Sequence, residues 1–237
     1  MNDAPLLVFG AHPDDIEFGC GGVVAIEARA GRRVHFVVCS RGEAATNGNR
    51  DQRTQEAERA ASILGASLQF VDLDGDAHLE VKVTHAIKLA EVIRQIRPGT
   101  VLAPSCVENQ HPDHARLGLL VRDAARLARY GGFTELLHLE SHSIDLLLFY
   151  AVTPDGEPNN TSPILVDISS EEIIHAWTEA MNAHLTQAQS RHYIDLQLAR
   201  ARVWGERAAV QYAMALYAND PLVVESLSQI GRGARHY

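Results

Sequence analysis

The sequence has few cysteines and no long apolar segment. Its three cysteines, Cys20, Cys39 and Cys106, stand singly and form no CxxC pair, which argues against a disulfide framework and against a structural zinc site. No run approaches the ~18–20 apolar residues that a membrane-spanning helix needs. The N-terminus lacks the basic and long apolar regions of a secretory signal peptide. We therefore expect a protein of the reducing cytoplasm, without a membrane partner.

Basic charge is also scarce. Lysine and arginine together number 21 against 30 aspartates and glutamates, a formal net charge of -9, which argues against nucleic acid as a partner. Hydrophobic residues make up 46% of the chain, enough for a full core in a globular protein. No linker, repeat or low-complexity tract interrupts the sequence. We therefore predict a single domain over residues 1–237.

Short apolar runs alternate with stretches of helical periodicity. This alternation predicts βαβ units and an α/β fold, namely a Rossmann-like, mostly parallel sheet flanked by helices with a less regular C-terminal portion. Strands are predicted over residues 5–9, 34–39, 68–73, 100–104, 144–151 and 164–168. Helices are predicted over residues 21–30, 51–64, 84–96 and 112–129, from about residue 170 onward, and over about 195–217.

The first predicted strand ends in the run AHPDD, residues 11–15. Within five residues the chain presents the imidazole of His12 and the adjacent carboxylates of Asp14 and Asp15. Ligands of open α/β sheets bind just outside the carboxyl ends of the strands, which is where this run falls. A polar turn that caps the next helix is the structural alternative for this run alone.

A second run, HPDH at residues 111–114, follows another predicted strand. Its histidines are spaced H-x-x-H, while His12 and Asp15 are spaced H-x-x-D. Two imidazoles and a carboxylate at two strand ends suit a metal site with three protein ligands and an open position. The pair of motifs therefore favours a catalytic metal site over two unrelated turns.

These residues resemble the PIG-L/LmbE-like family of zinc-dependent de-N-acetylases. The resemblance rests on AHPDD, on the glycines that follow it, and on HPDH. It extends to RGE at residues 41–43, RTQEA at 53–57 and AHLTQ at 183–187. The spacing is most similar to the bacterial branch that deacetylates N-acetylglucosaminyl-malate in bacillithiol synthesis.

The resemblance implies a role for each residue of the two motifs. It assigns the metal to three residues: His12, Asp15 and His114. The metal implied is Zn²⁺, with Fe²⁺ or another divalent ion as the alternative. Asp14 is implied as the general base, and His111 as an imidazolium that stabilises the tetrahedral oxyanion. Asp113 is placed to support a nearby histidine as a carboxylate behind the metal ligands.

Other positions bear on the substrate. Arg53 and Glu43 are candidates for substrate binding, since arginine can hold a carboxylate or sugar hydroxyls. His184 is a further candidate, which can either line the pocket or tie two helices together. Asn109 stands where some relatives have a tyrosine, and Met214 where many have a glutamate. The remaining histidines outside the strands are expected to be solvated or structural: His78, His85, His138, His142, His175, His192 and His236.

The expected activity is that of a metal-dependent hydrolase removing an acetyl group from an N-acetylated amino sugar or its conjugate, with N-acetylglucosaminyl-malate among the candidates. The protein is also expected to be a homo-oligomer, a hexamer being one form. An amidase acting on another small amide, such as a thiol conjugate, is the first alternative. Two histidines and a carboxylate also bind iron in non-haem Fe(II) oxygenases, but a parallel sheet disfavours that class. A metal-binding protein without activity is disfavoured because Asp14 and His111 are both present.

Overall fold

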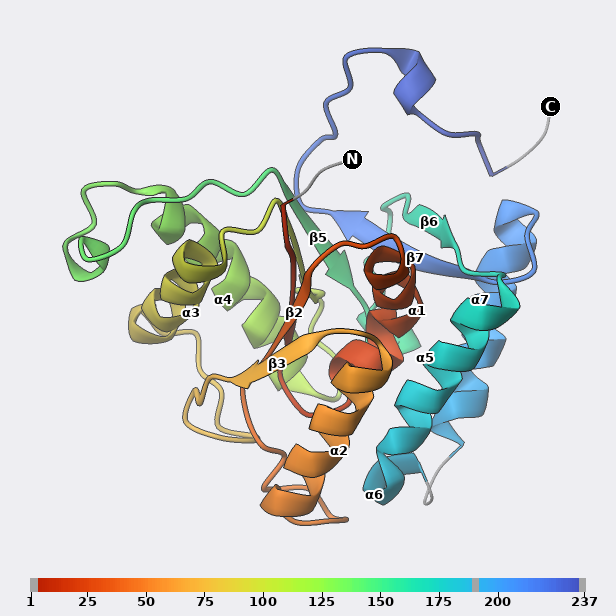
Figure 1. Cartoon of the computed structure of the whole chain (residues 1–237), viewed down its shortest axis with the longest axis horizontal. Helices are drawn as coiled ribbons and strands as arrows, with labels where there is room; N and C mark the ends of the chain where they lie inside the picture. The colour runs from red at the N-terminus through yellow and green to blue at the C-terminus, as the bar shows by residue number, and fades with distance from the viewer. Residues whose placement is uncertain (1–3, 189–191, 235–237) are drawn as a thin grey trace.

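A computed structural model of the chain describes residues 4–188 and 192–234. These residues form a seven-stranded sheet in the order β3-β2-β1-β4-β5-β7-β6 (Figure 1). The strands are β1 Leu6–Gly10, β2 Val34–Val38, β3 Ser67–Phe70, β4 Thr100–Pro104, β5 Leu146–Tyr150, β6 Ile164–Asp167 and β7 Ala213–Ala218. Pairing is parallel from β3 to β5, whereas β7 runs antiparallel to both β5 and β6. The predicted α/β fold is confirmed.

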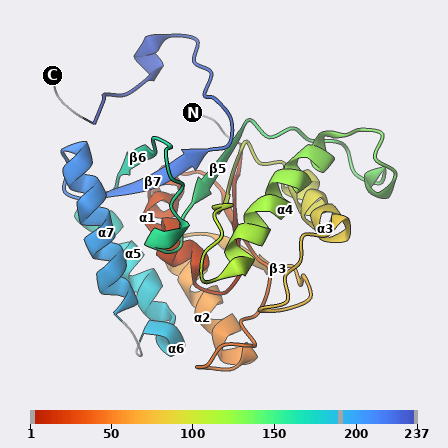
Figure 2. The same cartoon turned by 180° about the vertical axis from the view of Figure 1, so that it is seen from behind.

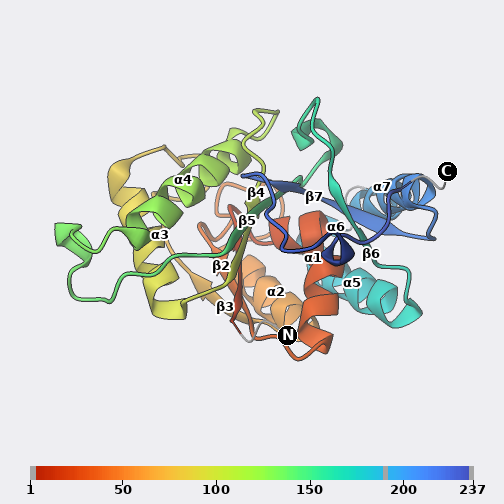
Figure 3. The same ribbon diagram turned by 90° about the horizontal axis from the view of Figure 1, so that it is seen from above.

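Helices cover both faces of this sheet. The helices are α1 Asp15–Arg29, α2 Arg50–Ile63, α3 Val83–Ile96, α4 Pro112–Arg129, α5 Glu171–Ala183, α6 Leu185–Ala188 and α7 Tyr193–Ala208. Helices α3 and α4 lie on one side of the sheet, and α1, α2, α5 and α7 lie on the other (Figures 1 and 3). Each side has its own apolar core, so the central strands are buried on both faces, as parallel strands usually are. None of the helices in residues 4–188 and 192–234 has the length and apolar character to cross a membrane.

The predicted third strand, residues 68–73, ends earlier, at Phe70, and two larger differences concern helices. The helix predicted over 195–217 ends at Ala208, and residues 213–218 form β7 instead. The helix predicted from Gly21 begins at Asp15, so the glycine-rich stretch lies inside α1, which is kinked at Cys20.

The glycines are accommodated in α1 because large aromatic side chains pack directly on them. A Cβ at Gly19 would collide with the ring of Tyr150, whose hydroxyl donates to the Phe9 carbonyl at 2.7 Å. A Cβ at Gly21 would meet the indole of Trp177, which donates to the Glu17 carbonyl at 2.7 Å. These contacts fix the start of α1 against the sheet.

Candidate functional site

The AHPDD run forms a tight loop between β1 and α1. Asp15 turns its Oδ2 back onto the loop, where the backbone N–H groups of Ala11 and His12 each donate to it at 2.9 Å. The preceding Asp14 has a φ of 111°, in the left-handed region that costs a non-glycine residue about 1 kcal/mol or more. The loop therefore holds the Asp15 carboxylate inward, and the backbone of Asp14 is strained.

Asp15 lies between the two histidines expected to share a metal with it. Its Oδ2 is 3.4 Å from His12 Nδ1, and its Oδ1 is 3.1 Å from His114 Nε2. All three side chains are buried. Burial alone would raise the pKa of Asp15, but the two histidines hold that pKa well below its usual range. An ionised carboxylate thus lies between two imidazoles.

His111 completes a group of three imidazoles. Its ring centroid is 4.6 Å from that of His12 and 4.8 Å from that of His114, on which it stacks. Partial burial of the ring, followed by the nearby His12 and His114, lowers the pKa of His111. A lowered pKa favours the neutral ring at physiological pH, whereas the resemblance implied an imidazolium.

Asp76, which the sequence marked only as part of a turn, also reaches the site. It lies on the loop between β3 and α3, and its Oδ1 is 3.2 Å from His12 Nε2. Asp113 Oδ2 is 3.4 Å from the same nitrogen and accepts a hydrogen bond from the backbone N–H of Ala77 at 2.9 Å. Both carboxylates therefore support His12 on the side of the ring away from Asp15. The position of Asp76 after β3, at the same sheet edge as the two motifs, was the available signal.

Glu43 joins two loops of the site rather than standing alone beside it. Its carboxylate accepts hydrogen bonds from the backbone N–H groups of Asp76 at 3.1 Å and Arg41 at 2.9 Å. Asp76 in turn accepts from the backbone N–H of Ala44 at 3.2 Å. These reciprocal bonds tie the β2–α2 loop to the β3–α3 loop and so fix Asp76 against His12.

Arg53 on α2 contacts Asp14 from the interior of the protein. It is only 4% exposed, and its Nη2 donates to the Pro13 carbonyl at 2.6 Å and to Asp14 Oδ2 at 3.1 Å. Its Nη1 donates to the Gly42 carbonyl at 3.4 Å, and its buried Nε has no hydrogen-bond partner in the described chain. Burial raises the pKa of Asp14 to about 6, although the Arg53 guanidinium acts in the opposite direction. Arg53 therefore holds the Asp14 carboxylate in place above its strained backbone.

His184 is fully buried beside Glu17. Its Nε2 lies 3.4 Å from Glu17 Oε2. Burial disfavours the charged ring, but Glu17 and Asp14 raise the pKa of His184 above its usual value. Two residues further along the chain, Thr186 donates its backbone N–H and its hydroxyl to the Glu56 carboxylate on α2, at 2.9 and 2.7 Å. In this arrangement the segment around His184 connects helices, and its imidazole is closed to solvent.

The two positions that depart from the family pattern have different surroundings. Asn109 Oδ1 accepts the backbone N–H of His111 at 2.8 Å, so it orders the loop before the second motif. Met214 is buried in β7, with its sulfur against Gly22 of α1. Met214 therefore belongs to the core on the α1 side of the sheet.

The other histidines have mixed surroundings. His85 is buried and its Nδ1 is 2.9 Å from the Glu80 carbonyl oxygen, while His138 is exposed beside Glu91. His192 is exposed next to Asp195. His236 lies outside the described residues.

Within the described residues, two overlapping groups have donor atoms close enough to hold a metal ion. Nitrogens of His12, His111 and His114 lie within 4.8 Å of one another, as do donor atoms of His12, Asp76 and Asp113. Imidazole nitrogens and carboxylate oxygens suit zinc or iron, and the buried Nδ1 of His114 lacks any hydrogen-bond partner in the part of the chain described. The residues present therefore fit a divalent metal, with His12 common to both groups. Asp15, predicted as a ligand, is in neither group, although its carboxylate contacts both His12 and His114.

Comparison with known proteins gives similar sequences and a similar fold. The chain is 32% identical over 139 residues to the 4-oxalmesaconate hydratase of Pseudomonas putida, covering 54% of each protein. It therefore spans about half the length of that relative. It is 29% identical over 195 residues to the diacetylchitobiose deacetylase of Thermococcus kodakarensis, covering 77% of this chain and 69% of the other.

Among solved structures, the conserved protein TT1542 from Thermus thermophilus superposes with a TM-score of 0.82. That match has 29% identity and covers 93% of this chain and 97% of the other. The family profile described as "PIG-L: GlcNAc-PI de-N-acetylase" matches residues 7–125, which include both motifs and every residue discussed above from His12 to His114. The chain belongs to the PIG-L family.

Proposed function

We propose that this protein is a metal-dependent hydrolase that removes an acetyl group from an N-acetylated amino sugar or its conjugate. The observation that carries the proposal is the position of Asp14, held by Arg53 directly beside the buried group of His12, Asp15 and His114. An amide needs both an activated water and stabilisation of the negative charge that forms on its oxygen. This arrangement has residues suited to each task.

Metal binding is proposed for His12, Asp15 and His114, because the Asp15 carboxylate lies 3.4 Å from His12 and 3.1 Å from His114. His111 is the alternative to Asp15, since its ring nitrogens group with those of the two histidines. Zn²⁺ held there supplies a Lewis acid and lowers the pKa of bound water; Fe²⁺ or another divalent ion is the alternative. Asp76 and Asp113 orient His12 through its Nε2. The ion would thus contact residues from both motifs and receive support from a third loop.

Asp14 is the proposed general base. With a pKa of about 6 it is ionised at neutral pH, yet basic enough to accept a proton from the attacking water. The same carboxyl group can then donate that proton to the departing amine. Its side chain is 17% exposed, so it can face a substrate while Arg53 holds it from the protein side.

His111 is proposed to stabilise the oxyanion as a neutral donor. A neutral imidazole keeps one N–H, which can donate a hydrogen bond to the oxygen of the tetrahedral intermediate. His111 is an exposed residue at the N-terminal end of α4, so its ring can face a substrate. This role needs no positive charge on the ring.

Acetate release tests the activity directly. The protein is incubated with a panel of N-acetylated amino sugars and conjugates, including N-acetylglucosaminyl-malate, and acetate is measured with and without a chelator. Metal-dependent acetate release supports the proposal and identifies the best substrate. Absence of acetate from the whole panel with metal-loaded protein would contradict it.

Asp14→Asn tests the base. We expect the variant to retain its metal and lose roughly 10²–10⁴-fold in kcat, because a carboxamide cannot accept the proton. Turnover and metal content are measured on the same preparation, with Asp155→Asn, at an exposed aspartate, as the control. Retention of more than about a tenth of the activity would exclude Asp14 as the base.

Removal of a ligand tests the metal site. His114→Ala should lower the bound metal well below one ion per chain, as measured by elemental analysis, while His138→Ala, an exposed histidine, should leave it unchanged. His111→Ala separates the two ligand sets, because it should keep its metal only if His111 is not a ligand. Full occupancy in His114→Ala would overturn the assignment.

A hydratase is the second candidate, because one relative is named a 4-oxalmesaconate hydratase. Addition of water to a carbon–carbon double bond also requires a group that takes a proton from water, and Asp14 could serve there too. The two activities are separable in one experiment. Hydration of 4-oxalmesaconate without acetate release from any amide would favour the hydratase.

A further inference from the structure

Arg116, near the start of α4, joins this helix to the loop between β3 and α3, residues 71–82. Its Nη1 donates to the Leu79 carbonyl at 3.0 Å and lies 3.3 Å from Asp113 Oδ1. The first turns of α4 and this loop lie side by side (Figure 2). Arg116 lies outside both sequence motifs, and the proposed function gives it no task.

The carboxylate that Arg116 contacts is one that supports His12. Asp113 is only 1% exposed, so its charge is stable only with hydrogen-bond donors around it. Its Oδ2 accepts the backbone N–H of Ala77 at 2.9 Å and lies 3.4 Å from His12 Nε2. Asp113 therefore turns one oxygen to the histidine of the metal site and the other to Arg116.

Two carboxylates share the same nitrogen of His12. Donor atoms of His12, Asp76 and Asp113 lie within 4.8 Å of one another. The Nε2 atom carries at most one proton, so it can donate to one carboxylate at a time, and the two like charges repel each other. Among the lysines and arginines of the described chain, Arg116 alone pairs with either carboxylate. It is therefore the side chain that offsets this repulsion.

The loop that Arg116 contacts is itself strained. Ala77 has a φ of 64°, in the left-handed region that alanine adopts only at a cost. In this conformation the Ala77 N–H donates to Asp113, and the preceding residue, Asp76, faces His12. Leu79, two residues further along, is buried and accepts from Arg116. Arg116 thus holds the strained turn against α4 at a second point.

We propose that Arg116 is a positioning residue of the metal site, which fixes Asp113 and the β3–α3 loop together and through them orients His12. The inference rests on the metal site of the proposed function. Without Arg116, Asp113 Oδ1 loses its partner and the loop is held to α4 by the Ala77 bond. His12 is then less well oriented to bind a metal ion.

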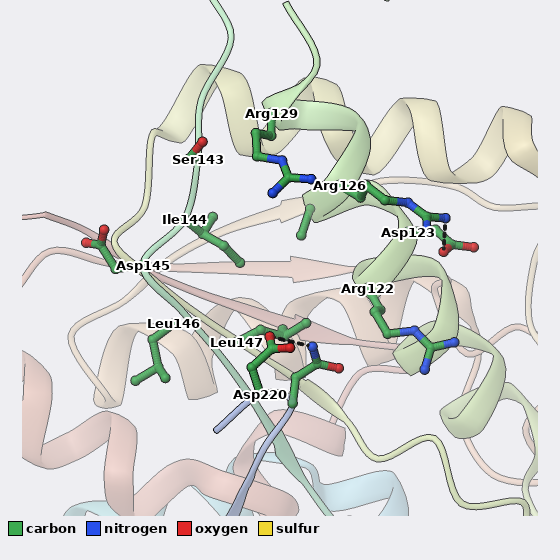
Figure 4. A pocket seen from close by; sticks show the side chains of 12 residues that line it. Arg122, Asp123, Arg126, Arg129, Ser143, Ile144, Asp145, Leu146, Leu147 and Asp220 are labelled. Carbon is green, nitrogen blue, oxygen red and sulfur yellow. Dashed lines mark hydrogen bonds and ion pairs between the residues drawn. The ribbon is translucent and has the colours of Figure 1, made fainter. Parts of the chain in front are cut away.

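Three other arginines lie farther along the same helix. They line a hollow of about 570 Å³ beside the start of β5: Arg122, Arg126 and Arg129 (Figure 4). Arg126 pairs with Asp123 at 3.1 Å. Within the residues that the structure describes, none of the three pairs with a carboxylate of the metal site. The exposed Arg122 is therefore a matched control, with the same charge on the same helix.

Zinc affinity tests the proposal directly. The Kd is measured by competition with a chromophoric chelator on the full-length protein. We expect Arg116→Gln to raise the zinc Kd roughly tenfold, the lower end of the effect of residues behind metal ligands. Arg122→Gln should leave the Kd unchanged. An unchanged Kd in Arg116→Gln, or an equal rise in Arg122→Gln, would overturn the proposal.

A double-mutant cycle tests whether Arg116 acts through Asp113. Asp113→Asn should itself raise the zinc Kd, because the amide supports His12 less well than the carboxylate. In that background Arg116→Gln should add less than about a twofold further rise, since its partner is already altered. A full multiplication of the two losses would mean that Arg116 acts by a different route, and the proposal would fail.

Hydrogen exchange at the Ala77 amide gives a readout that needs no metal. In the metal-free protein, NMR should show exchange of this N–H roughly fivefold faster in Arg116→Gln, because its bond to Asp113 opens more often. The amide of Ala60 on α2 should keep its rate. An unchanged rate at Ala77, or an equal acceleration at Ala60, would overturn the local role of Arg116. A wild-type chain that binds no zinc would instead contradict the proposed function, so the two failures are distinguishable.

Discussion

Two buried arginines, one on each side of the sheet, differ in what satisfies their charge. Arg53 on α2 is 4% exposed and Arg94 on α3 is 3% exposed. Arg94 contacts no carboxylate within the described residues and donates only to backbone carbonyls: those of Leu127, Ala128, Tyr130, Leu136 and Leu139. Arg53 donates to two carbonyls and to Asp14, and its Nε has no partner in the described chain.

The surroundings of each arginine indicate what it does. Arg94 donates hydrogen bonds to the last carbonyls of α4 and to carbonyls of the loop that follows, where the helix dipole favours a positive charge. Its partners do not titrate, so it stabilises one fixed structure. Arg53 contacts a carboxylate that does titrate, in a loop with a strained backbone. A buried cation with a titratable partner is thus tied to chemistry, whereas one with carbonyl partners is tied to the fold.

The largest effect should follow from removing Arg94. Arg94→Met leaves buried carbonyls without donors, each costing about 1–3 kcal/mol, so we expect the free energy of unfolding to fall by about 3 kcal/mol or more. Denaturant unfolding measures this loss, with the exposed Arg59→Met on α2 as the control. Turnover per folded molecule should be nearly unchanged. A loss of unfolding free energy below about 1 kcal/mol would contradict the structural role of Arg94.

Removing Arg53 should affect activity more than stability. Arg53→Met frees Asp14 to leave its strained position, and we expect kcat/KM to fall roughly 10–100-fold. The free energy of unfolding should fall by only about 1 kcal/mol, because fewer bonds are lost and a buried, unpartnered Nε is removed. Kinetics and unfolding are measured on one preparation. Equal stability losses in the two methionine variants would show that both arginines are structural.

The smallest effect is a shift in pH dependence. Because Asp14 must be ionised to act as base, kcat/KM should fall as the pH drops through about 6, which forms the acid limb of the pH profile. A cation bound nearby would move this limb to lower pH. Arg53 lowers the pKa of Asp14, so Arg53→Met should move this acid limb to higher pH by about 1 unit. Arg53→Lys keeps a cation and should restore part of the shift. A limb that stays in place would mean that Arg53 does not act on Asp14.

Much of the fold could be predicted from the sequence because its strands and helices have strong local patterns. The continuous apolar runs of β1 and β4 each end in a polar motif, and parallel pairing brings those ends to one edge. The prediction failed at β7. Residues 213–217 are all buried, so the strand shows no alternation, and its apolar residues were assigned to the preceding helix.

The site was less predictable because several of its contacts depend on distant loops. Asp76 looks like an ordinary turn residue, and hydrogen bonds of the β3–α3 loop with Glu43, Ala44 and Asp113 hold it beside His12. In the same way, the family pattern suggests Arg53 as a substrate contact, but its burial under Asp14 is a consequence of how α2 packs. Motifs mark which residues meet, and tertiary packing decides which atoms face each other.

The backbone of Asp14 has a consequence for laboratory evolution of this protein. Glycine adopts a φ of 111° without strain, so Asp14→Gly relieves about 1 kcal/mol of backbone energy, but it also deletes the proposed base and leaves the buried Arg53 without its carboxylate partner. A library screened only for heat resistance would therefore accept glycine here together with a neutral residue at position 53, and this double change would lose turnover unnoticed. Selection has to read catalysis and thermal resistance in the same clone if the aspartate is to survive it.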